Sequence, residues 1–204
     1  MEHLKIGVLC SRNGTNLQAI IDACVNGQLE AELRVVVGNN SKSYAFIRAE
    51  RARILVSHIS RKTHKSLNGI DEAILETLLD NEVNLVLLAG YMKKLGPKTI
   101  SEYHGRILNI HPSLLPLYGG KGMYGRAVHQ AVLTAGDLVT GASIHLINNE
   151  YDVGKILSQV KIPVRNDDTV DSLSNRVLKH EHELYVKTLQ MIERGDVKLE
   201  GFKN

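Results

Sequence analysis

Asn109 and His111 form the pair of residues with the clearest chemical potential in this chain, and Pro112 follows them directly. Side chains two residues apart on a strand point to the same side. A proline after His111 ends strand pairing and keeps the backbone extended. An amide is a neutral hydrogen-bond donor and an imidazole carries a proton near neutral pH, so the pair could act on one small target. The His-Pro dipeptide alone favours an ordinary turn, whereas the octet 109–116 favours a functional role.

A second candidate is the loop that follows the first apolar segment and contains Asn13, Gly14, Thr15 and Asn16. Glycine lets the backbone approach a ligand, and the start of the following helix offers unpaired N–H groups to an anion. The later glycines of a dinucleotide fingerprint and the lysine of a P-loop are absent from this pattern. Taken alone, the loop is equally well interpreted as helix capping by Thr15 or Asn13.

Three more features allow two interpretations each. Asp152 precedes a glycine turn and is by default an Asx turn, unless the fold brings it against His111. The segment 119–125 contains four glycines, which suits either a lid or a simple flexible loop. His145 falls in an expected strand, where a core histidine with satisfied hydrogen bonds is more common than a catalyst.

Apolar patterning predicts an α/β fold with a mainly parallel central sheet flanked by helices and a long C-terminal helix. Strands are expected at residues 4–10, 33–37, 54–59, 85–89, 106–110, 142–147 and 156–164. Helices are expected at residues 43–52, 97–103 and 169–193, with two more along the apolar stripes 17–25 and 70–79. The first stripe places Val25 on the buried face, and the second leaves Asp71 on a solvated face.

The composition is that of a soluble globular protein. The chain has 204 residues, 43% hydrophobic and 23% charged, with a net charge of +3, too weak to indicate nucleic acid. Cys10 and Cys24 are expected to be buried thiols of a cytoplasmic protein, and their spacing does not suit a metal site. The apolar run 6–10 is too short for a signal peptide, and no stretch is long enough to span a membrane.

The chain resembles the glycinamide ribonucleotide formyltransferase family, folate-dependent enzymes of purine synthesis. The resemblance covers nearly the whole length. It rests on residues 11–21, 88–92, 109–116, 141–145 and 151–152, and on Glu181-His182. It implies a Rossmann-like formyltransferase fold and one domain over residues 1–204. The nucleotide-binding half would span about 1–105, and the catalytic and folate-binding half about 106–204.

The resemblance also implies roles for individual residues. Asn109, His111 and Asp152 match the catalytic triad of the family. The phosphate of the ribonucleotide would bind Gly14, Thr15 and Asn16, and its ribose hydroxyls would bind Glu181. The folate pocket would be lined by Met92, Lys93, Lys94, Leu95, Asn109 and Asn148.

The implied reaction starts when the amine of glycinamide ribonucleotide attacks the formyl carbon of 10-formyltetrahydrofolate. Asn109 and protonated His111 would donate to the developing oxyanion, and Asp152 would keep His111 charged and relay a proton through water. The resemblance implies no metal and a monomer or homodimer. In the family, a polar residue is common at the position of Leu178. The resemblance therefore leaves open which basic residue contacts the ligand, one near residues 61–65 or Lys179.

Rival functions remain at this point. A formyltetrahydrofolate hydrolase and a sugar-nucleotide formyltransferase are related enzymes, but the former would need a further domain and the latter a nucleotide pocket. A catalytically silent binding module on the same fold is a rival of another class. The presence of Asn109, His111 and Asp152 argues against that module.

Overall fold

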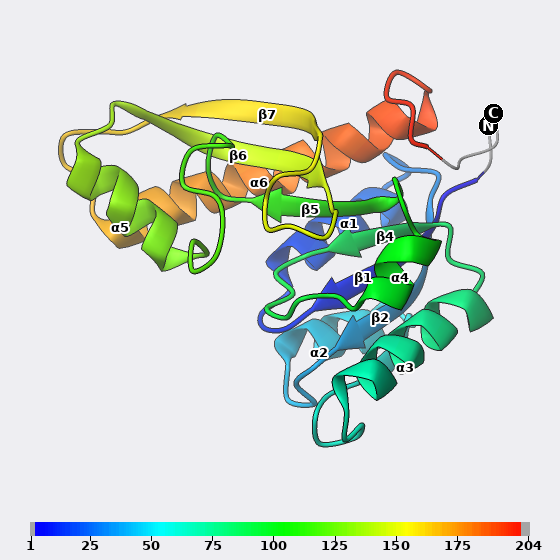
Figure 1. Cartoon of the computed structure of the whole chain (residues 1–204). Coiled ribbons are helices and arrows are strands. Elements are labelled where there is room, and N and C mark those ends of the chain that lie inside the picture. The colour runs from blue at the N-terminus through cyan, green and yellow to red at the C-terminus, as the bar shows by residue number, and fades with distance from the viewer. Residues whose placement is uncertain (1–2, 201–204) are drawn as a thin grey trace.

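The computed structural model describes residues 3–200 as one seven-stranded sheet with helices on both faces (Figure 1). The strands are β1 (Lys5–Cys10), β2 (Glu32–Gly38), β3 (Leu55–His58), β4 (Leu85–Leu88), β5 (Ile107–His111), β6 (Val139–Leu146) and β7 (Ile156–Pro163). The helices are α1 (Thr15–Val25), α2 (Tyr44–Arg51), α3 (Leu67–Asp80), α4 (Pro97–Glu102), α5 (Arg126–Ala135) and α6 (Val170–Glu193). The expected α/β fold with a long C-terminal helix is confirmed.

The strand order is β3-β2-β1-β4-β5-β6-β7. The strands from β1 to β5 pair in parallel, whereas β6 pairs antiparallel with both β5 and β7. The chain therefore builds the sheet outward from β1 through β2 to the edge strand β3. It then crosses back to β4, next to β1, and builds outward to the other edge strand, β7. In open sheets of this kind, ligands bind beyond the carboxyl ends of the strands where the order reverses. Here that point lies between β1 and β4.

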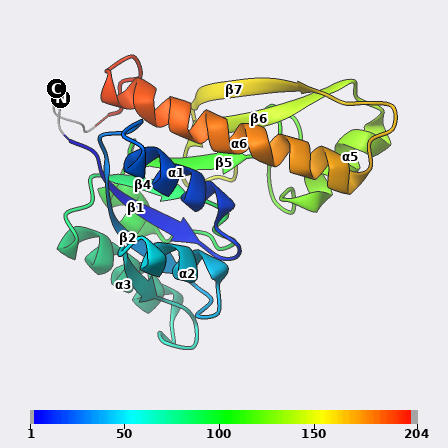
Figure 2. The ribbon, with the colours of Figure 1, turned by 180° about the vertical axis from the view of Figure 1, so that it is seen from behind.

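Two apolar layers cover the sheet. One layer joins α1, α2 and α6 to one face through side chains such as Leu17, Phe46 and Leu184. The other joins α3 and α4 to the opposite face through Ile74 and Ile100. Strand β4 (LVLL) is buried along its whole length because both layers cover it. Figure 2 shows α1 and α6 side by side on the face opposite α3.

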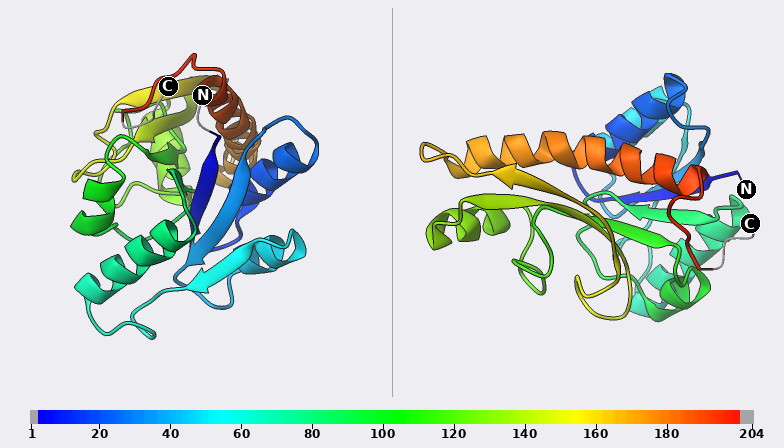
Figure 3. Two further views of the ribbon diagram at one scale, coloured as in Figure 1. Left: turned by 90° about the vertical axis from the view of Figure 1, so that its right-hand side faces the viewer. Right: turned by 90° about the horizontal axis from the view of Figure 1, so that it is seen from above.

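Helix α6 links the two halves of the sheet (Figure 3). It runs along β6 and β7 and then contacts α1. Thr169 caps its first turn, where the Thr169 and Ser172 side chains each accept from the other's backbone N–H. The helix thereby brings a residue near position 180 to the start of α1.

The structure corrects four expectations. Cys24 is only partly buried, because it packs against the apolar layer from its border. Val25 is 78% exposed, because it ends α1 beyond the apolar layer. Asp71 is 2% exposed, because its carboxylate turns inward to accept from the first backbone N–H groups of α4. Helix α5 was not expected, because the glycine-rich segment 119–125 directly before it gives no sequence signal for the start of a helix. The expected domain ends, residues 1 and 204, lie outside the described residues.

Candidate active site

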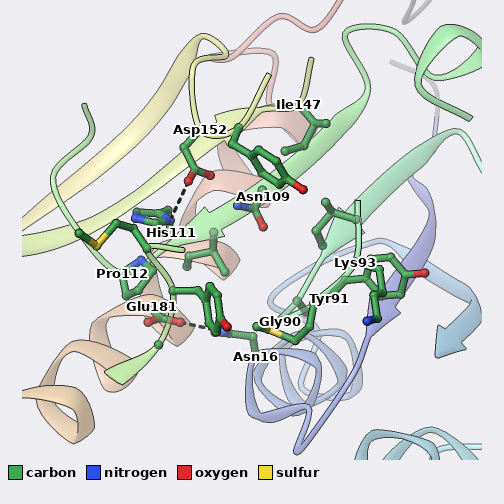
Figure 4. Close-up of a pocket in the computed structure, with 18 of the residues that line it drawn as sticks. Asn16, Gly90, Tyr91, Lys93, Asn109, His111, Pro112, Ile147, Asp152 and Glu181 are labelled. Carbon is green, nitrogen blue, oxygen red and sulfur yellow. Dashed lines mark hydrogen bonds and ion pairs between the residues drawn. The ribbon is translucent and has the colours of Figure 1, made fainter. Parts of the chain in front are cut away.

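A cavity of about 680 Å³ lies at the carboxyl ends of β1, β4 and β5 (Figure 4). It collects side chains from segments far apart in sequence. Every residue expected to act in catalysis or binding lines it: Gly14, Thr15, Asn16, Met92, Lys93, Lys94, Leu95, Asn109, His111, Asn148, Asp152 and Glu181. These residues therefore share one cavity.

His111 ends β5, and each of its ring nitrogens has a polar neighbour in the protein. Its Nε2–H donates to the Tyr118 carbonyl at 2.8 Å, and its Nδ1 lies 3.6 Å from Asp152 Oδ2. The first contact fixes the ring, because a carbonyl oxygen can only accept. The second separation is longer than a hydrogen bond, so the ring and the Asp152 carboxylate lie side by side without a direct hydrogen bond. The conditional prediction that Asp152 meets His111 is confirmed.

Asn109 is oriented by His145, its partner in the β5–β6 register. The Asn109 amide donates to His145 Nε2 at 3.0 Å, while His145 Nδ1 donates to the Leu146 carbonyl at 3.0 Å. This pattern needs the neutral imidazole, and burial lowers the pKa of His145, which favours that form. His145 is fully buried as expected of a core histidine, but its partners belong to the site.

Asp152 is held by the glycine-rich segment. Its Oδ2 accepts from the Gly120 N–H at 2.9 Å, and its backbone is left-handed with φ 56°. Its Oδ1 lies 3.5 Å from His145 Nε2. The Asx turn expected at Asp152 is therefore wrong, because its carboxylate faces His111 and His145 instead of its own backbone. Residues 120–125 of this segment line the cavity.

The start of α1 faces the cavity without a side-chain cap. Gly14 occupies the N-cap position with φ 68° and ψ 35°, and neither Asn13 nor Thr15 caps the helix. A Cβ at Gly14 would lie 2.6 Å from the Cβ of Ala45, so only glycine fits without a shift. The first backbone N–H groups of α1 thus remain available to an anion.

Asn16 and Glu181 join α1 to α6 at the same end of the cavity. Asn16 Nδ2 donates to Glu181 Oε2 at 2.9 Å, although the residues are 165 positions apart. Burial raises the pKa of the Glu181 carboxyl, and the hydrogen bond from Asn16 opposes that rise. Asn16 Oδ1 is buried without a protein partner among the described residues. A ligand hydroxyl could donate to it.

The segment after β4 forms the opposite wall. The Met92 N–H donates to Ser11 Oγ at 2.8 Å, which ties this segment to the β1 loop. Lys94 Nζ lies 5.4 Å from the centroid of the Tyr151 ring. Asn148 Oδ1 accepts from the Glu150 N–H at 2.9 Å and so shapes the turn before Asp152. This wall combines exposed lysines with the buried Leu95.

The interpretation of His145 as a core histidine with satisfied hydrogen bonds is confirmed, but its contact with Asn109 was not anticipated. His129 was not singled out from the sequence. His129 lies on α5, lines the cavity and is 2% exposed. The one local signal is that Val128 and Val132, four residues apart, indicate a buried face of α5 beside His129. Within residues 3–200, no group of three or more His, Cys, Asp or Glu side chains could hold a metal ion. No helix in that range is long and apolar enough to cross a membrane.

Comparison with known proteins agrees with this geometry. A family model described as "Formyl transferase" matches residues 4–189. The chain belongs to the formyl transferase family. A phosphoribosylglycinamide formyltransferase of Haemophilus influenzae is 39% identical over 195 residues, covering 96% of this formyl transferase and 90% of the relative.

Larger relatives and solved structures match as well. The bovine trifunctional purine biosynthetic protein adenosine-3 is 36% identical over 195 residues, and this formyl transferase spans 19% of its length. The crystal structure of glycinamide ribonucleotide transformylase 1 from Symbiobacterium toebii has a TM-score of 0.90 at 36% identity. That alignment covers 98% of this formyl transferase and 92% of the solved chain.

Proposed function

We propose that this formyl transferase moves the formyl group of 10-formyltetrahydrofolate to the amine of glycinamide ribonucleotide, a step of de novo purine biosynthesis. One observation carries the proposal. Asn109, His111 and Asp152 converge in a cavity that also contains the uncapped start of α1 and the Glu181 carboxyl. A phosphate at one end and a reacting amine near His111 suit that layout.

The ribonucleotide would bind through α1 and α6. Gly14, Thr15 and Asn16 would hold the phosphate, because the helix start offers free N–H groups and a positive dipole end. The Glu181 carboxyl and Asn16 Oδ1 would accept from the ribose hydroxyls. The buried, unpartnered state of Asn16 Oδ1 supports this, since such an acceptor costs stability unless a ligand satisfies it.

The folate would bind along the opposite wall. Met92, Lys93, Lys94, Leu95, Asn109 and Asn148 would line its pocket. A cavity of about 680 Å³ falls in the range of small-molecule sites, which supports this fit. We also propose the division into a nucleotide-binding half, about 1–105, and a catalytic and folate-binding half, about 106–204. Residues 92–95 belong to the first half, so the folate pocket would contain residues from both halves.

The catalytic residues have distinct tasks in this proposal. The donor supplies the formyl group when it is bound. Asn109 would donate its second amide hydrogen, and His111 its Nδ1 proton, to the oxygen that becomes negative as the amine attacks. His145 holds the Asn109 amide and the Tyr118 carbonyl holds the His111 ring, so little reorganisation is needed. Asp152 would stabilise the charge on His111 and pass a proton from the amine, through water, to the leaving folate nitrogen.

The deciding experiment compares two acceptors. The protein is given 10-formyltetrahydrofolate with and without glycinamide ribonucleotide, and formylated ribonucleotide and free formate are both measured. Formylated ribonucleotide as the dominant product supports the proposal. Formate released at the same rate without the ribonucleotide would identify a hydrolase. Absence of both products would favour a silent binding module or a sugar-nucleotide formyltransferase.

Location and assembly complete the proposal. We propose a cytoplasmic protein, consistent with two unpaired cysteines, one of them buried. We propose a monomer or homodimer, which size-exclusion chromatography with light scattering distinguishes.

A further inference from the structure

One short backbone segment, residues 118–120, contacts both His111 and Asp152, which face each other in the cavity (Figure 4). The Tyr118 carbonyl accepts from the Nε2–H of His111 at 2.8 Å. Two residues later, the Gly120 N–H donates to Asp152 Oδ2 at 2.9 Å. The place of this segment therefore sets where the imidazole and the carboxylate lie relative to each other.

The backbone of this segment is held in an unfavourable conformation. Tyr118 has φ 54°, in the left-handed region that residues with a side chain rarely adopt. Such a conformation persists only where the surrounding contacts hold it. The next two residues, Gly119 and Gly120, have no side chains with which to anchor the segment. The anchor must therefore come from Tyr118 itself.

The Tyr118 side chain provides that anchor. Its hydroxyl donates to Asp137 Oδ2 at 2.6 Å, and its ring packs against the apolar layer that includes α6. The hydrogen bond to the Asp137 carboxylate raises the pKa of Tyr118, so the hydroxyl keeps the proton that it donates. Asp137 lies just after α5, where its N–H donates to the Val132 carbonyl at 3.3 Å. The segment is thus tied to the end of α5.

The first part of the loop between β5 and α5 is held separately. Ser143 Oγ donates to the Ser113 carbonyl at 2.6 Å and accepts from the Leu115 N–H at 3.0 Å. Ser113 Oγ donates in turn to the Leu117 carbonyl at 2.5 Å. These contacts do not involve the Tyr118 hydroxyl. Loss of that hydroxyl should therefore loosen only the part of the loop beside the cavity and leave the fold intact.

We propose that Tyr118 is a positioning residue for formyl transfer, because its hydrogen bond to Asp137 holds the segment that sets the spacing of His111 and Asp152. The effect on rate rests on the proposed function, whereas the effect on the His111 ring does not. Tyr118 is not among the residues that line the cavity, so it acts through this pair and not on a ligand. Loss of the anchor should slow the chemical step and leave ligand binding unchanged.

Steady-state kinetics with both substrates separates kcat from KM. Y118F removes the hydroxyl and keeps the ring, so kcat should fall about tenfold with little change in either KM. D137A removes the acceptor and should give the same loss. D137N keeps an oxygen that can accept from the hydroxyl and should recover most of the rate. The double variant Y118F/D137A should be no slower than either single variant, because both changes remove the same bond.

The matched control is Y103F. The Tyr103 hydroxyl donates to the Val83 carbonyl at 3.1 Å, and this buried tyrosine does not line the cavity. Y103F therefore also removes one hydrogen-bonded hydroxyl, but at a site remote from His111 and Asp152. It should lower stability and leave kcat unchanged.

A second readout needs no turnover. NMR of protein with isotope-labelled histidine follows the exchange of the His111 Nε2 proton with water, and the His111 signals are identified by their absence in H111A. A proton held by the Tyr118 carbonyl is protected from exchange. Its exchange should be about tenfold faster in Y118F and D137A than in the unaltered protein, and close to normal in D137N and Y103F.

Four outcomes would overturn the inference. They are a kcat of Y118F equal to that of Y103F, a loss in Y118F that lies entirely in KM, a D137N variant as slow as D137A, and equal proton exchange in Y118F and the unaltered protein. Failure of the proposed function is distinguishable from these. It would show as an unaltered protein that forms no formylated ribonucleotide, and proton exchange at His111 would still test the anchor.

Discussion

The chemistry of the site depends on which side-chain atoms already have partners. His111 and Asn109 each have one nitrogen engaged by the protein, at Tyr118 and His145 respectively. In the proposed reaction, the second amide hydrogen of Asn109 and the Nδ1 side of the His111 ring would face the reacting oxygen. Residues that touch no ligand can therefore set the reaction rate by fixing these two donors.

His145 is predicted to act as a positioning residue for Asn109. His145→Ala removes the acceptor that orients the amide, so kcat should fall about 10–100-fold, as when an oxyanion donor is misplaced. The KM for each substrate should change little. His145→Gln, whose carbonyl oxygen can still accept from Asn109, should recover part of the rate. A fall in kcat/KM that comes entirely from a higher KM would contradict the positioning role. Equal kcat values for His145→Ala and His145→Gln would also contradict it.

Thr15 is predicted to serve the ribonucleotide and not the folate. Thr15→Val keeps the shape of the side chain and removes its hydroxyl, so ribonucleotide affinity should fall about tenfold, the usual effect of losing one hydrogen bond to a charged group. Folate affinity should stay the same. Calorimetry with each ligand alone measures both constants, and a larger loss for folate would count against the phosphate placement.

At the scale of elements, buried polar contacts connect helices that periodicity describes separately. The Asp71 carboxylate of α3 accepts from the Lys98 N–H at 2.8 Å, the Thr99 N–H at 3.1 Å and the Thr99 hydroxyl at 2.6 Å. It thus caps the start of α4, whose N-cap residue, Gly96, has no side chain to do so. A carboxylate that looks solvated on a helical wheel is here a link between two helices.

Asp71→Ala is predicted to destabilise the protein strongly. It leaves the buried Thr99 N–H without an acceptor and the Thr99 hydroxyl with only the backbone carbonyl of residue 71, so the free energy of unfolding should fall by about 2–4 kcal/mol. Asp71→Asn keeps one acceptor oxygen and should lose less. Glu76→Ala, an exposed carboxylate on the same helix, is the matched control and should stay within about 0.5 kcal/mol of the unaltered protein. Urea denaturation gives all three values, and a mild Asp71→Ala would disprove the capping role.

Local patterns predicted those parts of the fold that local forces decide. The buried strand at 85–88 follows from a continuous apolar run, and the buried face of α6 follows from the helical spacing of its apolar residues. The roles of Asp71 and His145 could not be read this way. The first depends on how α3 packs on α4, and the second on the register that pairs Asn109 with His145 across two antiparallel strands. Both arise only when distant segments meet.

At the scale of the whole molecule, α6 and the glycine-rich segment complete the cavity. Helix α6 brings Glu181 to α1, and the Gly120 N–H holds Asp152. From sequence spacing, the contact between Asp152 and His111 could be stated only as a condition, because the 40 residues between them include loops, α5 and β6. The same packing buries His129 in the cavity wall, and burial lowers the pKa of His129 from its ordinary value of 6.5 to about 4.

His129 is predicted to make stability depend on pH. Between pH 6.5 and about 4 the unfolded chain binds a proton that the folded protein does not, so stability falls as the pH falls through this window. His129→Gln should make the loss of stability between pH 7 and pH 4 smaller by about 2 kcal/mol. His104→Gln, whose native side chain is 72% exposed, should leave the slope unchanged. Urea denaturation at pH 7 and pH 4 checks both variants, and equal slopes for His129→Gln and the unaltered protein would refute the assignment.

The central claim is that His111 donates the proton that stabilises the transition state of formyl transfer. The most direct measurement is the single-turnover rate of formylated ribonucleotide formation by His111→Ala, with folding checked by circular dichroism and ligand binding by calorimetry. We predict a loss of about 10³-fold or more with both ligands still bound. A folded variant that forms the product at close to the normal rate would contradict the account.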